Sequence, residues 1–178
     1  MVDVRIIVDH LKLDYTGVFD TKQLFRLINQ WHMERGFQKR DFKTFEQSLA
    51  DGKYIEHELA HWEKVSDYIR LMYKMRMLFS GLKRVEIMQD GKKVSMDQGK
   101  VLIYMDGYIE HDYEHRWEKT PMLQFLRVIF DKFIYKYYTE RFEQRIAYDL
   151  HSLYDTLERF FNMYRHYRPV SKVSHFAH

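Results

Sequence analysis

The longest stretch of this sequence without a glycine or a proline runs from residue 122 to residue 168. It follows Thr120 and Pro121, a capping hydroxyl and a proline in the position that suits the first turn of a helix. One straight helix over these residues would be about 70 Å long. A compact domain of this chain length is only about 40 Å across. The sequence therefore predicts a long C-terminal helix that either bends or extends beyond the globule.

Apolar residues divide this predicted helix into two halves. The stripe of the first half ends at Tyr137, and the next positions on that face, Glu140, Arg141 and Gln144, are polar. A second stripe then follows the spacing of a coiled-coil heptad. It consists of Ile146, Leu150, Leu153, Leu157, Phe160 and Tyr164. Its partner is expected to be a second copy of the chain or the helix predicted at 21–35. A homodimer is favoured, because the second half of the helix would extend beyond the globule.

The rest of the chain predicts a strand, a helix and then an antiparallel meander. Residues 2–14 are β-branched and largely alternating, which is typical of a strand, and residues 21–35 carry apolar residues at helical spacing before Gly36. Residues 69–79 alternate between apolar and polar side chains and predict the clearest strand. Turns are predicted at Asp51-Gly52, Asp90-Gly91 and Asp97-Gln98-Gly99, and a bulge or bend at Asp106-Gly107.

This order of elements resembles the helix-grip (START-like) fold over roughly residues 2–138. The resemblance implies an α+β protein in which a curved antiparallel meander grips the C-terminal helix and often encloses an apolar cavity. We expect residues 1–138 to form this domain, residues 139–168 a helical dimerisation segment and residues 169–178 a flexible basic tail. The expected cavity lining is Tyr73, Met75, Met77, Ile103, Met105, Phe130 and Phe133. A fully packed core is the other interpretation of these residues.

One stretch matches a catalytic motif letter by letter. His57-Glu58-Leu59-Ala60-His61 has the form H-E-x-x-H and resembles the motif of zinc-dependent metallopeptidases. That resemblance implies zinc ligation by His57 and His61, with Glu58 activating the metal-bound water. Ligation requires a helix, because on a strand the two histidines would lie about 13 Å apart. An Asp-Gly turn just upstream and a strand pattern downstream favour a strand, so no cofactor is expected and zinc is the alternative.

The net charge of +3 arises near the C-terminus, where residues 121–178 carry nine basic and six acidic side chains. Cations interleaved with aromatic residues suit phosphate contacts and base stacking. Cations at the end of a helix can also simply complement its dipole. Lysines in the Asp90-Gly91 hairpin are also suited to phosphate contacts. The expected anion-binding or nucleic-acid-binding residues are Arg159, Arg165, His166, Arg168, Lys172, Lys92 and Lys93.

Several function classes are excluded by residues that the sequence lacks. Without cysteine there is no disulfide and no thiolate metal site, and there is no glycine-rich phosphate loop or dinucleotide fingerprint. No apolar stretch approaches a membrane span, and the charged first residues do not resemble a signal peptide, so we expect a cytoplasmic protein. The expected function is a non-catalytic, dimeric binding or assembly protein that engages RNA or a ribonucleoprotein through its basic, aromatic end. The alternatives are a carrier of an apolar small molecule and a zinc hydrolase.

Overall fold

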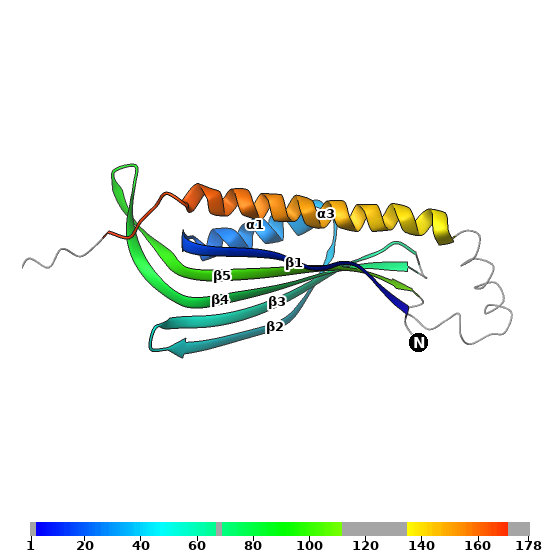
Figure 1. Cartoon of the computed structure of the whole chain (residues 1–178), viewed down its shortest axis with the longest axis horizontal. Helices are drawn as coiled ribbons and strands as arrows, with labels where there is room; N and C mark the ends of the chain where they lie inside the picture. The colour runs from blue at the N-terminus through cyan, green and yellow to red at the C-terminus, as the bar shows by residue number, and fades with distance from the viewer. Residues whose placement is uncertain (1–2, 67–68, 112–134, 171–178) are drawn as a thin grey trace, which may run out of the picture.

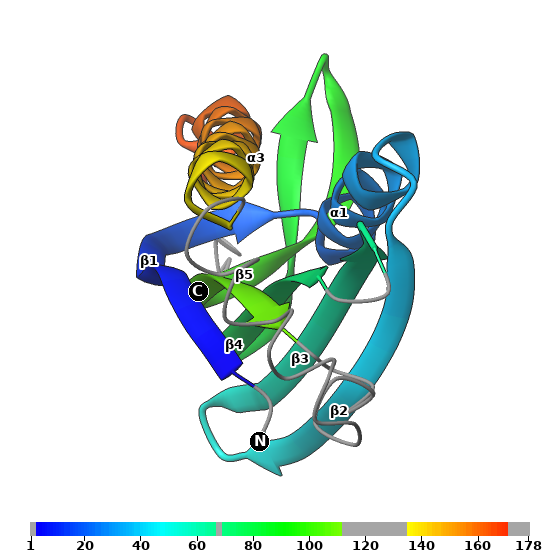
Figure 2. The same cartoon turned by 90° about the vertical axis from the view of Figure 1, so that its right-hand side faces the viewer.

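The computed structural model describes residues 3–66, 69–111 and 135–170, with the side chains of 4–37, 43–66, 69–111 and 140–170. Five strands form one antiparallel sheet in the order β1-β5-β4-β3-β2. Two helices, α1 and α3, lie on the same face of that sheet (Figures 1 and 2). The predicted α+β class, with a meander under a long C-terminal helix, is confirmed. The elements are β1 (Asp3–Phe19), α1 (Thr21–Glu34), β2 (Gln38–Leu49), β3 (Gly52–Lys64), β4 (Ile69–Gln89), β5 (Lys92–His111) and α3 (Tyr135–Tyr164).

The first strand lies beside the last strand rather than beside the second. The pairing of β1 with β5 runs from Asp3 opposite His111 to Phe19 opposite Asp97. Strands β2 to β5 follow one another across the sheet, so β1 and β2 occupy its two edges. The chain has to cross the sheet between them. Helix α1 makes that crossing on the face that α3 also covers (Figure 2).

Helix α1 begins and ends where its residues predict. The Asp20 side chain accepts hydrogen bonds from the backbone N–H groups of Lys22 and Gln23, at 2.8 and 3.1 Å, and so satisfies two donors of the first turn. Gly36 follows the helix with a φ of +70°, a conformation that favours glycine. The helix buries one face against the sheet, through Leu24, Ile28, Trp31 and His32.

Two of the three predicted turns are confirmed. Strands β2 and β3 are joined at Asp51-Gly52, and β4 and β5 at Asp90-Gly91. In the second turn both central residues have positive φ, 49° at Asp90 and 74° at Gly91. This conformation matches the right-handed twist of a hairpin, which explains the Asp-Gly sequence.

The third predicted turn, at Asp97-Gln98-Gly99, is wrong. Strand β5 runs without interruption through these residues, and the irregularity lies in β4, where the register shifts between Ser80 and Lys83. A Cβ atom on Gly99 would lie 2.9 Å from the Ser80 carbonyl oxygen, so this glycine allows a close approach of two strands. The pair β4–β5 then bends toward the C-terminal end of α3 (Figure 1).

The heptad-like seam of α3 faces the sheet of its own chain, which corrects the expectation that it mediates a dimer. All six seam residues are buried within the single chain, in one core with the inward side chains of β4 and β5. A sheet and a second helix offer a helix the same apolar surface, so the spacing alone does not distinguish the two partners. The six residues are Ile146, Leu150, Leu153, Leu157, Phe160 and Tyr164.

The expected division of the chain at residue 139 is corrected for the same reason. The first turns of α3 reach past the end of the sheet in Figure 1, and Glu140 and Arg141 are exposed there. The half of the helix after Ile146 lies on the sheet and belongs to the domain core. Beyond α3, Val170 donates its backbone N–H to the Glu86 carbonyl at 2.8 Å. Residues 171–178 of the expected tail, and the helix start at Thr120-Pro121, lie outside the described residues.

Within the described residues, no helix is both long enough and apolar enough to span a membrane.

Candidate functional site

The H-E-x-x-H stretch lies on strand β3, as the strand interpretation predicts. His57 and His61 point toward α1, where the ring of Phe25 lies 5.1 Å from His57 and the ring of His32 stacks on His61 at 3.3 Å. Glu58 is on the opposite face of the strand, because neighbouring residues of a strand alternate. Residues 57–61 therefore lack the helical geometry that zinc ligation requires, and the zinc-hydrolase alternative is wrong.

These two histidines instead belong to the packing between α1, β2 and β3. Thr44 Oγ1 and His57 Nδ1 are hydrogen-bonded at 2.6 Å across the β2–β3 pair. His61 is fully buried. His32 donates from Nδ1 to the Ile28 carbonyl one turn earlier in α1, at 2.7 Å, which fixes its ring over His61. The histidines thus contribute to the docking of α1 on the sheet.

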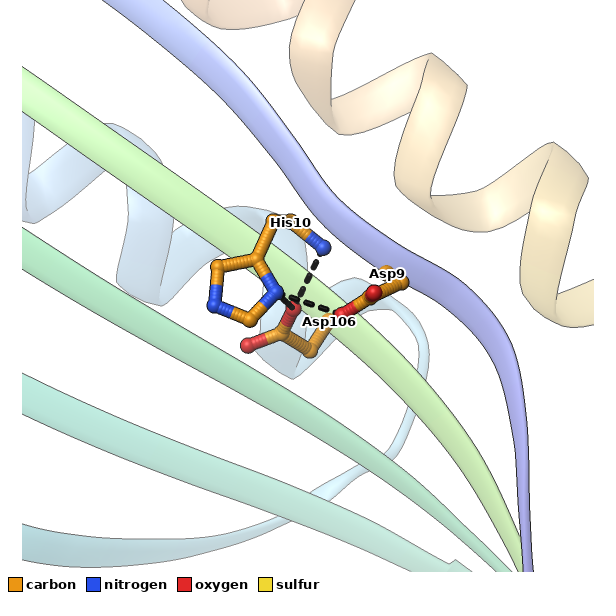
Figure 3. A group of neighbouring side chains, drawn as sticks. All are labelled: Asp9, His10 and Asp106. Carbon is orange, nitrogen blue, oxygen red and sulfur yellow. Dashed lines mark hydrogen bonds and ion pairs between the residues drawn. The ribbon is translucent and has the colours of Figure 1, made fainter.

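A different histidine lies in the one described group that brings three possible metal-ligating atoms within 4.8 Å of one another. It consists of Asp9 and His10 on β1 and Asp106 on β5 (Figure 3). The group sits where the β1–β5 register shifts twice, between Ile6 and Leu11. His10 has a φ of +52°, which is uncommon for a residue other than glycine and marks a bulge within β1.

The hydrogen bonds within this group show what holds the bulge. The Asp106 carboxylate, which is buried, accepts the His10 backbone N–H at 2.6 Å. His10 Nδ1 lies 2.5 Å from Asp9 Oδ1 and 3.4 Å from Asp106 Oδ1. Asp106 therefore satisfies a donor that the bulge removes from the strand ladder. A carboxylate-oriented imidazole can also exchange protons, and this donor set is one that divalent cations accept.

The pKa values of His10 in this group and of the neighbouring Tyr108 are both raised. The hydrogen bond to Asp9, and then the charge of Asp106, raise the pKa of His10 above its ordinary value of 6.5. Burial and the neighbouring Asp106 carboxylate raise the pKa of Tyr108. Arg76 lies close enough to oppose part of the effect on His10 and lies over the ring of Tyr104, 5.3 Å from its centre.

A second polar network lies, partly buried, between the two helices and the sheet. Asp149 on α3 accepts from the Tyr73 hydroxyl at 3.0 Å and from Arg35 Nε at 3.2 Å. Arg35 follows α1, donates also to Ser152 Oγ at 3.2 Å, and lies over the Trp31 ring at 3.9 Å. Burial, and then the Asp149 charge, raise the pKa of Tyr73. The network joins α1, α3 and β4 through one carboxylate.

Most residues expected to line an apolar cavity are packed in the core. Five of them are buried in the hydrophobic cluster under α3: Tyr73, Met75, Met77, Ile103 and Met105. Phe37 stacks on Tyr73 with ring centres 4.6 Å apart. The two others, Phe130 and Phe133, lie outside the described residues. The described members of this set act as core residues.

The expected cationic residues lie around the end of α3 and at the tip of the β4–β5 hairpin. Arg159, Arg165, His166 and Arg168 are exposed, and so are Lys92 and Lys93. Lys172 lies outside the described residues. The aromatic residues between the arginines are a different matter, because they face the core. Phe160, Phe161 and Tyr164 are buried, which corrects the expectation that they stack on bases.

Neither of the two polar groups was recognised in the sequence. Asp9 and His10 interrupt the apolar alternation between Val8 and Leu11, and that interruption is the signal of a bulge in β1. The bulge was predicted instead at Asp106-Gly107 on the partner strand. Arg35 and Asp149 are separated by most of the chain, and no local pattern relates them.

No protein-family model matches this chain, and no curated protein matches it.

Proposed function

We propose that this protein is a non-catalytic binding protein that engages RNA through a cationic end. The proposal rests on one observation, the placement of two cationic groups that are distant in sequence. The tip of the β4–β5 hairpin and the C-terminal end of α3 lie at the same end of the molecule (Figure 1). The hairpin carries Lys92 and Lys93, and the end of the helix carries Arg165 and Arg168.

A backbone contact connects these two groups. Val170, two residues after Arg168, donates its N–H to the carbonyl of Glu86 on the hairpin. Lys93 Nζ lies 3.8 Å from the Glu86 carboxylate, with both side chains about two-thirds exposed, so this ion pair is weak. Such a pair leaves the lysine available to a stronger anion.

The binding mode follows from which side chains are exposed. Arginine and lysine contact phosphates without reading the sequence, and each contact makes the affinity depend on salt. Aromatic stacking on bases would need exposed rings, and three of the four aromatic residues near this end are buried. We therefore expect backbone contacts with little sequence preference. A cytoplasmic location is part of this proposal, and a homodimer is not required by it.

The test is the anisotropy of a labelled single-stranded RNA titrated with the protein at several salt concentrations. The four-residue variant with Lys92, Lys93, Arg165 and Arg168 changed to serine should bind at least about tenfold more weakly, with a shallower salt dependence. Each phosphate contact removed should lower the slope of log affinity against log salt by about 0.7.

The matched control removes cations elsewhere on the surface. Lys43 on β2 and Arg141 near the start of α3 are both exposed, and their change to serine should leave RNA affinity close to that of the unchanged protein. The control removes two cations and the test variant four, so an equal loss of affinity per removed cation would show a general charge effect and contradict the proposed surface. No binding by the unchanged protein at low salt would contradict the function itself.

A further inference from the structure

A groove of about 810 Å³ lies between α1 and α3, and every residue that lines it belongs to one of these two helices. Its apolar residues are Leu27 of α1 and Phe160 and Met163 of α3. Phe160 is buried and forms the floor, whereas Met163 is 59% exposed at the edge. Ligand sites commonly have volumes of about 300–1,000 Å³ with mainly apolar walls and a few placed polar groups. The groove between the helices has this composition.

Its polar groups include hydrogen-bond donors from both helices. The Tyr164 hydroxyl, on a side chain that is more than nine-tenths buried, donates to Gln23 Oε1 and so joins the two helices. Because the amide oxygen of Gln23 is used in this way, the amide presents its NH2 group to the groove. Asn162 adds a second amide to the rim.

Arg159 is the only charged residue among the described residues that line the groove. Its Nε donates to the backbone carbonyl of Asp155, at 3.1 Å, which directs the side chain along the helix. The remaining guanidinium donors are suited to a planar or tetrahedral anion. A groove with one cation, amide donors and no lining carboxylate is complementary to a single negative group.

The length of the groove distinguishes between two kinds of occupant. Its lining on α3 runs from Thr156 to Met163, about 10 Å along the helix axis. A partner helix bound in a groove makes contacts over at least two turns on both sides, spaced at i, i+3, i+4 and i+7. Helix α1 contributes only Gln23 and Leu27 to this groove. The size therefore suits a small ligand rather than a helix of another protein.

We infer that this groove binds a small amphipathic anion, with the negative group on Arg159 and the apolar part between Leu27, Phe160 and Met163. The site is distinct from the cationic end proposed for RNA, because none of the four residues tested there lines it. It also differs from a cavity between sheet and helix, since all of its lining residues belong to the two helices and none to a strand.

Three probes separate the contributions of charge and apolar surface: octyl phosphate, octanol and inorganic phosphate, each below any micellar concentration. The readout is the NMR shift of methionine methyl groups in the full chain. The Met163 methyl group should shift with octyl phosphate, and Met33, which is exposed on α1 outside the groove, should not. The Arg159→Gln variant should bind octyl phosphate about tenfold more weakly, and octanol unchanged.

Arg141→Gln is the matched control, since it removes one exposed cation of the same helix away from the groove. The inference is overturned if octanol or inorganic phosphate binds as tightly as octyl phosphate. It is also overturned if Met33 shifts together with Met163, which indicates non-specific adsorption, or if Met163 does not shift with any probe. Arg159→Lys should retain part of the affinity, because it keeps the charge and loses the planar fork.

Discussion

Gly107 on β5 and Ile146 on α3 approach so closely that a Cβ atom on the glycine would overlap the Cγ2 atom of the isoleucine. The same Cβ atom would lie 2.9 Å from Cδ1 of Leu150. The helix therefore packs directly on the backbone of β5 at this point. The absence of a side chain at residue 107 lets Ile146 and Leu150 lie directly against the strand.

Changing Gly107 to alanine should destabilise the protein by about 1–3 kcal/mol, because an extra methyl group has no space between strand and helix. Urea unfolding measures the change. Ile146→Ala should cost less in the Gly107→Ala background than alone, since the smaller side chain makes room for the added methyl group. Strictly additive effects of the two substitutions would contradict the close contact.

Leu153→Ala should lower the free energy of unfolding by about 2–5 kcal/mol, because Leu153 is fully buried in the single chain. Light scattering of the folded variant should give the same mass as the unchanged protein. His151→Ala, at an exposed position of the same helix, is the control and should have little effect. A halved mass with unchanged stability would show that the seam faces a second copy after all.

Tyr73→Phe should destabilise the protein by about 1.5–3 kcal/mol, since it removes a buried hydrogen bond to the charged Asp149. Thermal or urea unfolding of both proteins gives the difference. The matched control is Tyr148→Phe, because Tyr148 is 72% exposed on the same helix that carries Asp149. Equal stabilities of Tyr73→Phe and the control would show that this hydrogen bond does not stabilise the packing of the helices.

His10 should titrate with a pKa above 6.5, and Asp9→Asn should lower that pKa, because the Asp9 carboxylate stabilises the protonated ring. NMR of the imidazole protons against pH measures both values. Since the pKa is raised in the folded state, the stabilisation is present below the unfolded value and disappears as the pH rises through the folded one. The unchanged protein should thus exceed Asp9→Asn in stability at acid pH, with the difference narrowing above neutrality. The same pKa in both proteins would contradict this contact.

Local signals were sufficient for much of the fold. The Gly36 stop and two Asp-Gly turns depend on backbone geometry that only a few residue types supply, so they are visible in a sequence. The alternation at residues 69–79 was equally direct. At Gly99 the same residue type served a close strand contact instead of a turn, and nothing in the neighbouring residues separates the two uses.

The polar groups were less accessible because their partners are far apart in the chain. Asp106 satisfies the backbone of His10, and Asp149 joins Arg35 to Tyr73, which are relationships that exist only after the sheet and helices have assembled. The H-E-x-x-H stretch shows the opposite situation. Its letters match a motif, but the turn at Asp51-Gly52 and the pairing of β3 on both sides place it in a strand.

The pairing of β1 with β5 also determines when the protein can fold. Asp3 is opposite His111, so β1, which is made before the other strands of this sheet, cannot complete its pairing until the end of β5 has been made. Contacts of such long sequence separation carry a large loop-closure entropy and slow the folding of a domain. Strands β2 to β5 can form hairpins during synthesis. We expect β1 to join them late, and its docking on β5 to be the step that limits the rate of folding.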